Sequence, residues 1–175
     1  MQKALDGIQM GLLVKIPLLF DGSRLGFSEN SFLQYDISQK DIGSGCYFLA
    51  WPTGHDYIVG FIGGRFAWNL SKQSGDEIVE YALSKVQSLY GGNIRKHFLK
   101  GVASDWAHNP LTRGSYSAVK PGCYGARELL SEPIAEKLIF AGEATAGNLA
   151  GLVNGAYESG KMAAIRIFNL IKSKN

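Results

Sequence analysis

The chain has 175 residues, with 18 Lys and Arg against 15 Asp and Glu, so its formal net charge is +3 when the histidines are neutral. A hydrophobic share of 46% with 19% charged residues excludes a disordered chain, and so small a positive surplus argues against a nucleic-acid partner. The length fits one domain with its own core, and glycine, with 22 residues, is unusually frequent.

Membrane spans, disulfide frameworks and metal sites are not expected. The charge-free stretch 144–157 is rich in Gly, Asn and Thr and falls short of about 18 apolar residues, and the N-terminus is a poor signal peptide. Cys46 and Cys123 lie far apart in the sequence, which favours a cytoplasmic protein with reduced thiols. The three histidines have no carboxylate or cysteine at ligand spacing, so no metal is expected.

The first predicted elements are strands. Residues 8–20 (IQMGLLVKIPLLF) form one long apolar strand or a strand pair, with a single charge at Lys15. Residues 32–37 can form a short strand. Segments 46–51 and 56–64 flank the sequence PTGH and predict a hairpin.

An amphipathic helix is predicted over residues 73–90. Asp76 and Glu77 lie in its first turn, apolar residues recur at helical spacing, and Gly91 ends it. The following segment, 94–106, predicts a further strand.

The C-terminal part begins with a long loop over residues 107–125. KLIFAG (137–142) predicts a short strand of the buried parallel type, followed by a glycine-rich turn and a helix from about residue 151 to residue 171. The whole chain therefore predicts a mixed α/β or α+β fold with much irregular backbone.

The final strand–turn–helix segment carries most of the functional information. Gly151, Gly155 and Gly160 lie on nearly one face of the predicted helix, although glycine inside a helix costs about 1 kcal/mol relative to alanine. This indicates that something flat or bulky packs against the backbone, and the helix N-terminus offers free N–H groups to an electron-rich ligand. Close helix–helix packing through small residues is the alternative, because a Gly-x-x-x-Gly spacing alone is a weak signal.

Three segments together carry motifs in the order of a known family. FAGEAT (140–145), followed by GxxxGAxxSGxxAA (151–164), resembles the C-terminal flavin-binding motif of the flavin-containing amine oxidases, which include monoamine oxidases, polyamine oxidases and lysine-specific histone demethylases. Segment 104–122, with its Trp, Asn-Pro and GSYS, resembles a loop of that family. Segment 12–20 resembles the strand bearing the family's lysine beside the flavin N5 atom.

The resemblance covers the whole chain as the C-terminal portion of an FAD-linked amine oxidase fold, a mixed substrate-domain sheet plus a strand–turn–helix that packs on the flavin. It implies a substrate-domain-like segment over residues 1–113 and a C-terminal FAD-binding segment over residues 114–175. The family's N-terminal GxGxxG dinucleotide-binding half is not found, because the glycine clusters at 43–45 and 60–64 lack a following helix and an acidic partner.

The resemblance also implies roles for individual residues. Lys15 and Tyr116 are the catalytic candidates. The cofactor-binding candidates are Trp106, Gly142, Glu143, Gly151, Leu152, Val153 and Gly155. Lys15 would hold a water against the flavin N5 atom, where dioxygen reoxidises the flavin, and its alternative role is that of a solvent-exposed strand lysine.

Glu143 would lie on the ribityl–pyrophosphate side, where its carboxylate hydrogen-bonds a cofactor hydroxyl or a backbone nest. Its alternative role is a helix N-terminal charge. The helix start at Leu152 and Val153 would face the N1–C2=O edge of the flavin ring, where reduction places negative charge. Trp106 and Tyr116 would flank the amine, with core packing as the alternative.

Three positions depart from patterns seen within the family. Ser115 stands where some members attach FAD through a cysteine, so non-covalent FAD is expected. Leu152 and Ala118 stand where members with a fuller aromatic cage carry aromatic residues, so no particular amine can be named.

The function implied is that of an FAD-dependent amine oxidase-like oxidoreductase. It transfers hydride from an amine C–H to flavin N5, with O2 as the acceptor, on a small-molecule amine. The chain would be a C-terminal fragment or subunit that works as an enzyme only when completed by an N-terminal FAD-binding half, and a homo-oligomer is the other partner expected from its open apolar faces. The alternative is a catalytically inactive, truncated relative that acts as a protein-interaction module or is a gene remnant.

Overall fold

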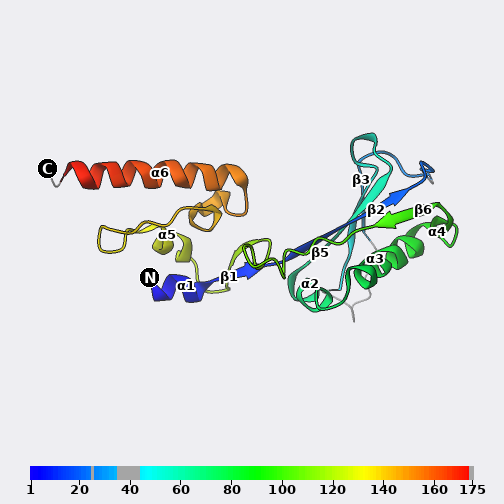
Figure 1. The fold of residues 1–175 in the computed structure, drawn as a ribbon, viewed down its shortest axis with the longest axis horizontal. Coiled ribbons are helices and arrows are strands. Elements are labelled where there is room, and N and C mark those ends of the chain that lie inside the picture. The colour runs from blue at the N-terminus through cyan, green and yellow to red at the C-terminus, as the bar shows by residue number, and fades with distance from the viewer. Residues whose placement is uncertain (25, 35–43, 174–175) are drawn as a thin grey trace. The chain divides into compact units, whose positions relative to one another are not determined.

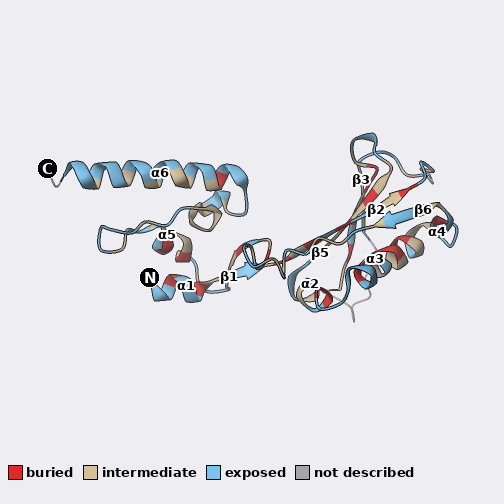
Figure 2. Ribbon diagram, in the orientation of Figure 1, coloured by how far each residue is buried: buried red, intermediate tan, exposed pale blue. Residues whose placement is uncertain are grey.

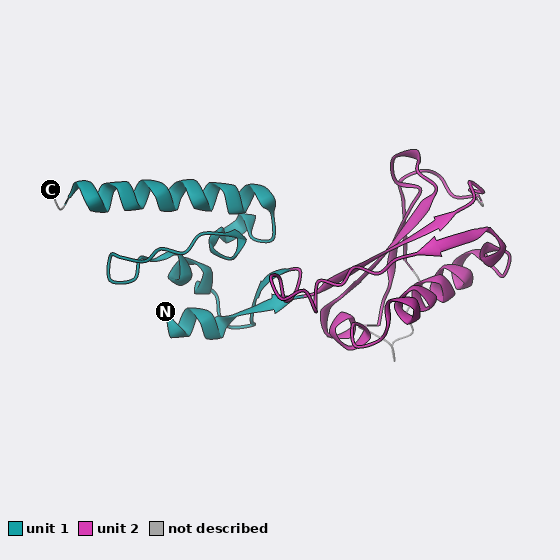
Figure 3. Cartoon of the chain, viewed as in Figure 1, with its two compact units in different colours: residues 1–11, 116–175 teal, residues 12–115 magenta. Residues whose placement is uncertain are grey.

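The computed structural model describes residues 1–24, 26–34 and 44–173. The chain divides into two compact units (Figure 3): unit 1 comprises residues 1–11 and 116–175, and unit 2 comprises residues 12–115. The division expected from the family resemblance, into residues 1–113 and 114–175, groups residues 1–11 with the first segment. In the structure these residues belong to unit 1, because strand β1 (Ile8–Gly11) pairs with strand β7 (Tyr116–Val119), and a pairing between such distant segments leaves no local signal in the sequence.

Unit 2 is built on a five-stranded antiparallel sheet in the order β3-β4-β5-β2-β6 (Figure 1). Its main elements are β2 (Leu13–Phe20), β3 (Ser31–Gln34), β4 (Tyr47–Ala50), η2 (Pro52–Gly54), β5 (Tyr57–Gly63), α2 (Gly64–Leu70), α3 (Gly75–Tyr90), α4 (Ile94–His97) and β6 (Phe98–Gly101). Contrary to the expectation from the sequence, the glycine cluster at 60–64 is followed by a helix, α2, but the strand before it, β5, is antiparallel to both of its neighbours and is not part of a βαβ unit. The predicted hairpin is confirmed, because β4 pairs with β5 across the short η2 turn. The predicted strand at 32–37 appears as β3 up to Gln34, and residues 35–37 lie outside the described residues.

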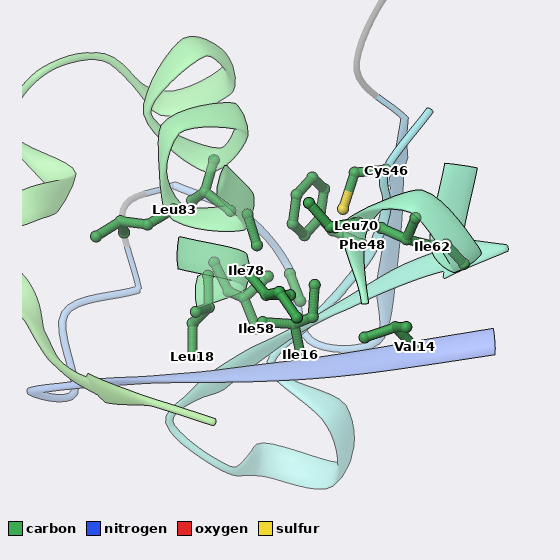
Figure 4. Packing of buried hydrophobic residues seen from close by; sticks show 14 of the residues in the cluster. Val14, Ile16, Leu18, Cys46, Phe48, Ile58, Ile62, Leu70, Ile78 and Leu83 are labelled. Atoms are coloured by element: carbon green, nitrogen blue, oxygen red, sulfur yellow. The ribbon is translucent and has the colours of Figure 1, made fainter. Parts of the chain in front are cut away.

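The core of unit 2 lies between this sheet and its helices (Figure 4). Along β2 the side chains alternate, so that Val14, Ile16 and Leu18 are buried while Lys15 and Pro17 are exposed. Helices α2 and α3 cover the buried face of the sheet and remove its apolar surface from water. Both helices carry buried residues, as the strands of the sheet do (Figure 2).

Helix α3 confirms the helix predicted over residues 73–90, and its two ends explain its length. Ser74 Oγ accepts a hydrogen bond from the Glu77 amide, and the Ser74 amide donates to the Glu77 carboxylate, which forms a capping box. Gly91 ends the helix with φ 90°, a conformation that favours glycine.

The strand predicted over residues 94–106 is wrong at both ends, because strand β6 covers only Phe98–Gly101. Residues 94–97 form the short helix α4, and strand β6 begins only at Phe98. The reason lies in the partner strand: β2 ends at Phe20, which is paired with Phe98, so residues before Phe98 have no strand to bond with. Ile94 instead turns into the core.

Unit 1 combines a two-stranded sheet with helices and short turns. Its elements are α1 (Gln2–Gly7), β1 (Ile8–Gly11), β7 (Tyr116–Val119), α5 (Ala126–Ser131), η3 (Glu143–Thr145), η4 (Gly147–Leu149) and α6 (Val153–Lys172). The apolar run at 8–20 is thus a strand pair, β1 and β2, with one strand in each unit. Helix α6 agrees with the predicted final helix to within two residues.

Two sequence predictions for unit 1 need correction. The predicted loop at 107–125 contains strand β7, which forms because β1 supplies its hydrogen-bonding partner. The predicted parallel strand at 137–142 is absent: within this segment the only ladder contact in the described residues is the antiparallel bridge between Ile134 and Leu138. A strand needs a neighbour for its N–H and C=O groups, and no described strand runs beside this segment.

Within the described ranges, no helix combines the length and apolar character that crossing a bilayer requires. The same residues contain no group of His, Cys, Asp and Glu side chains that could hold a metal ion.

Candidate functional site

The carboxylate of Glu143 is turned inward, toward the backbone of its own unit. Its Oε1 atom accepts a hydrogen bond from the Ser117 amide at 2.8 Å. Its Oε2 atom accepts from the Ser117 hydroxyl at 2.9 Å and from the Gly151 amide at 2.7 Å. Two backbone N–H groups from segments far apart in the sequence therefore bind one carboxylate, whereas the nest expected for Glu143 is made by successive N–H groups. A bond to a cofactor hydroxyl stays a prediction.

Arg127 completes this cluster from helix α5. Its Nη1 atom donates to Ser117 Oγ at 2.5 Å and to the Ala144 carbonyl at 3.1 Å, and its Nη2 atom donates to the Ser117 carbonyl at 3.0 Å. Ser117, only 6% exposed, thus has its amide, hydroxyl and carbonyl all bonded by Glu143 and Arg127. Sequence reasoning missed Arg127, because it lies outside every motif that the sequence contains.

Gly142 is fixed to helix α6 by a second serine. The Gly142 amide donates to Ser159 Oγ at 2.8 Å, and Thr145 Oγ1 donates to the Gly142 carbonyl at 2.9 Å. Gly142 has φ 140°, and among the described residues no atom would lie within 4 Å of a Cβ placed there. The turn formed by Gly142 and Glu143, here called the GE turn, therefore has its backbone held by hydrogen bonds and has open space beside its glycine.

The N-terminus of α6 has no side-chain cap within the described residues. The first amide that bonds back along the helix is that of Ala156, which donates to the Leu152 carbonyl. The amides of Val153, Asn154 and Gly155 precede it and belong to the set that a helix leaves without an internal partner. Leu152 is 51% exposed and Val153 is 89% exposed, so this positively polarised end is open to a ligand.

The glycines of this segment do not form the single stripe that the sequence predicts. Gly151 lies before the helix with φ 77°, and a Cβ on Gly160 would meet no atom of the part of the chain that the structure describes within 4 Å. A Cβ on Gly155 would lie 2.1 Å from the Leu149 carbonyl oxygen. At Gly155, the bulky group packed against the helix backbone is therefore the chain's own η4 turn.

Tyr116 lies in unit 1 and is 38% exposed. Strand pairing places it opposite Gly11, and a Cβ on Gly11 would lie 3.3 Å from the Tyr116 ring atom Cε2. The ring can lie over this strand position because glycine leaves it open. Tyr116 is also near the N-terminus of α6, since a Cβ on Gly151 would be 4.0 Å from Tyr116 Cβ.

Lys15 lies in unit 2, on the sheet face that points away from the core. Its backbone is held by Ser104, whose hydroxyl accepts from the Lys15 amide at 2.9 Å and whose amide donates to the Lys15 carbonyl at 2.9 Å. Phe61 is its cross-strand neighbour, and Phe61 stacks with Phe32 at 6.1 Å between ring centroids. The lysine therefore belongs to an outward face that carries aromatic rings.

Trp106 and Ser115 belong to the same unit as Lys15. Trp106 is 44% exposed, and its carbonyl accepts from the Gly114 amide at 2.9 Å and from Thr112 Oγ1 at 3.0 Å, which closes the loop between them. Ser115 Oγ accepts from the Leu13 amide at 2.9 Å and donates to the Leu13 carbonyl at 3.1 Å. The serine at the position of the covalent cysteine thus fastens the loop to the start of β2.

The candidate residues therefore divide between the units. Unit 1 holds Tyr116 and the whole of the segment from Gly142 to Gly155, and unit 2 holds Lys15 and Trp106. The mixed α/β arrangement, with two antiparallel sheets, is that of a partial amine oxidase fold.

The family follows from the sequence matches. The model of the flavin containing amine oxidoreductases matches residues 1–168, so the chain belongs to this family. Lysine-specific histone demethylase 1 homolog 2 of Arabidopsis thaliana is 30% identical over 174 residues, which cover 97% of this chain and 23% of that protein. Polyamine oxidase 2 of the same plant is 30% identical over 168 residues, which cover 93% of this chain and 32% of that protein.

A shorter match extends to rice. Polyamine oxidase 4 of Oryza sativa subsp. japonica is 36% identical over 115 residues, which cover 64% of this chain and 23% of that protein. The chain thus spans between 23% and 32% of the length of these three relatives.

Proposed function

We propose that the chain is the flavin-ring-binding portion of an FAD-dependent amine oxidase that acts on a small-molecule amine. The observation that carries this proposal is the uncapped, exposed N-terminus of α6, which follows the GE turn in a chain of a flavin-containing family. FAD, when bound, supplies the acceptor for a hydride from the carbon next to the amine nitrogen, and O2 takes the electrons.

The residues present fit such a group. The amides of Val153 and Asn154, both exposed residues, would donate hydrogen bonds to an electron-rich ring edge, and the partial positive charge of the helix end favours added negative charge there. The exposed side chains of Leu152 and Val153 would exclude water from that edge. Gly142 leaves space beside the turn, and Ser115 offers a hydroxyl already bonded to Leu13, which agrees with non-covalent FAD.

Tyr116 and Lys15 are the side chains proposed to work on the reactants. Tyr116 would orient the amine through its half-exposed ring. Lys15 would hold a water molecule with its exposed ammonium group on the outward sheet face. Trp106, in the loop held to Gly114, would contribute a second aromatic surface.

Activity would require a dinucleotide-binding half from another chain or from the rest of a longer protein. Helix α6 supports the need for a partner, because it is largely exposed (Figure 2) although it is rich in apolar side chains. The large apolar residues exposed on α6 are Val153, Tyr157, Met162, Ile165, Ile167, Phe168 and Ile171. So large an apolar set marks an interaction surface.

The same exposed residues favour a second candidate, an inactive relative that only binds other proteins or a second copy of itself. The two candidates differ in flavin binding. The full chain should be mixed with FAD, alone and with a separately produced dinucleotide-binding half of a related amine oxidase, and passed through gel filtration. Flavin absorbance that stays with the protein supports the oxidase. Stable self-association with no retained flavin in either mixture contradicts it and supports the interaction module.

The α6 amides can be tested with a pair of variants. Val153→Pro removes one N–H at the first helical position, where proline is tolerated, and Leu152, at φ −115° and ψ 145°, already has the backbone that precedes a proline. Flavin affinity should fall about tenfold, as expected for one lost hydrogen bond, while Val153→Ala, which keeps the N–H, serves as the control. Equal affinities of the two variants, measured by flavin fluorescence titration, would contradict the proposed role of these amides.

A further inference from the structure

Arg127 has no part in the proposed chemistry, yet it is hydrogen-bonded to groups that fix the backbone just before α6. Three of its hydrogen bonds end on Ser117 and Ala144. From Ser117 the bonds continue to Glu143, and from Glu143 to the Gly151 amide, two residues before α6 begins. The chain of contacts therefore runs from α5 to the start of α6 inside unit 1.

The structure assigns Arg127 the role of a positioning residue, which fixes Gly151 and the start of α6 through Ser117 and Glu143; its bearing on flavin rests on the function proposed above. A guanidinium has only donors, so Ser117 Oγ must accept from Arg127. The single hydroxyl proton of Ser117 is then directed to Glu143 Oε2. Arg127 thus fixes the direction in which the serine donates.

Glu143 needs this support because its oxygens carry several bonds at once. Oε2 accepts from both Ser117 Oγ and the Gly151 amide, while Oε1 accepts from the Ser117 amide. Linked bonds of this kind polarise one another and strengthen the set. A carboxylate that is bound on both oxygens by the protein acts as a clamp on the backbone.

Gly151 is the point where this clamp matters. Its φ of 77° is a left-handed conformation, and its amide donates to Glu143 just before the uncapped end of α6. Release of that amide would free the backbone that aims Val153 and the following N–H groups. The effect of Arg127 on a bound ring would then be indirect, through the angle and order of these amides.

The test is amide hydrogen exchange in the full chain, which needs no flavin. Arg127→Met is compared with Arg166→Met, a matched control that removes another half-buried arginine of unit 1, whose Nη1 donates to the Ser131 carbonyl at 2.8 Å. We expect exchange of the Gly151 amide to rise about tenfold in Arg127→Met and to stay within about twofold in the control. An unchanged rate, or equal rises in both variants, overturns the assignment.

Ser117→Ala provides a second variant if Arg127→Met does not fold, because it removes only the connecting hydroxyl. The single variant should also raise Gly151 exchange, and Arg127→Met combined with Ser117→Ala should add little to the larger single effect. Fully additive effects would show that Arg127 and Ser117 act separately, and would overturn the proposed linkage.

Flavin affinity of the chain completed by a dinucleotide-binding half gives the functional readout. Arg127→Met should weaken it several-fold while Arg166→Met leaves it unchanged, and equal affinities of these two variants overturn the bearing on flavin. If the unmodified chain retains no flavin at all, the proposed function fails, whereas the exchange rates still decide whether Arg127 positions Gly151.

Discussion

Serine hydroxyls form many of the hydrogen bonds that hold the backbone of the candidate residues in place. Ser104 bonds the backbone of Lys15, Ser115 that of Leu13, and Ser159 that of Gly142. A serine side chain is short and can both donate and accept, so it can replace a missing backbone partner in irregular segments. The GSYS sequence therefore has a structural role, since Ser115 bonds the Leu13 backbone and Ser117 bonds Glu143, on either side of the tyrosine.

Ser115→Ala should weaken unit 2 measurably. The variant leaves the Leu13 amide and carbonyl without their side-chain partner, which should lower the free energy of unfolding by about 1 to 2 kcal/mol. Ser88→Ala is the control, because this exposed hydroxyl donates to the Ser84 carbonyl within its own helix, α3. Urea denaturation checks the difference, and equal midpoints for the two variants would contradict the clamp.

Among the secondary-structure elements, those with strong local signals were predictable. Helix α3 shows helical periodicity between an acidic first turn and Gly91, and the β4–β5 hairpin has apolar runs on either side of a turn. The failures at α4, at β7 and at residues 137–142 have one cause: whether a short apolar segment becomes a strand depends on a distant partner. Phe98 begins a strand because Phe20 lies opposite, whereas Leu138 has only an isolated bridge.

The candidate site shows the same limit. The motifs located Glu143, Gly151 and Tyr116 by family resemblance, but not Arg127, whose role depends on contacts with Ser117 and Ala144. Periodicity also misread the glycines, because the sequence cannot show that the Leu149 carbonyl fills the space over Gly155.

Two glycines of α6 should respond to alanine with opposite sign. Gly160→Ala should stabilise the chain by up to about 1 kcal/mol, because alanine favours the helix and its Cβ would meet nothing within 4 Å. Gly155→Ala should destabilise it by about 1 to 3 kcal/mol, because the helix must move away from Leu149. Thermal unfolding followed by circular dichroism compares the two, and a stabilised Gly155→Ala would contradict the packing of η4 on α6.

The capping box of α3 should make part of the stability acid-sensitive. Hydrogen bonds from Ser74 hold the pKa of Glu77 below its ordinary value of 4.5. A lowered pKa in the folded state means that the stabilisation is fully present above the ordinary pKa and is lost as the pH falls through the folded pKa. Glu77→Gln should lower the Tm at pH 7 and reduce its decline between about pH 5 and pH 2.

Asp76→Asn is the matched control for that experiment, since it removes a carboxylate from the same helical turn but leaves the capping box intact. Tm curves of equal shape for Glu77→Gln and the unmodified chain would refute the assigned pKa effect. Asp21 beside His97 and Glu80 beside Arg95 also have lowered pKa values, so some decline should remain in the Glu77 variant.

At the scale of the whole molecule, the exposed apolar surface of α6 is the feature that most favours association of the chain. Tyr157 and Phe168 are exposed by 67% and 65%, and exposed apolar area of this extent drives association. Phe168→Asp should therefore shift the chain from assemblies toward monomers in sedimentation-velocity runs. A control variant, Lys72→Asp, also adds an acidic residue but lies outside α6. A monodisperse monomer before any substitution would refute the expectation.

The placement of Ser115 has a consequence for how the polypeptide is organised. Unit 2 is an insertion: the chain leaves unit 1 after Gly11 and returns at Tyr116. Its two ends are tied together, because Ser115 bonds both backbone groups of Leu13. A segment whose ends meet in this way suits circular permutation and domain insertion. We therefore expect that residues 12–115 can be replaced by the matching segment of a relative, or removed when a short linker joins Gly11 to Tyr116.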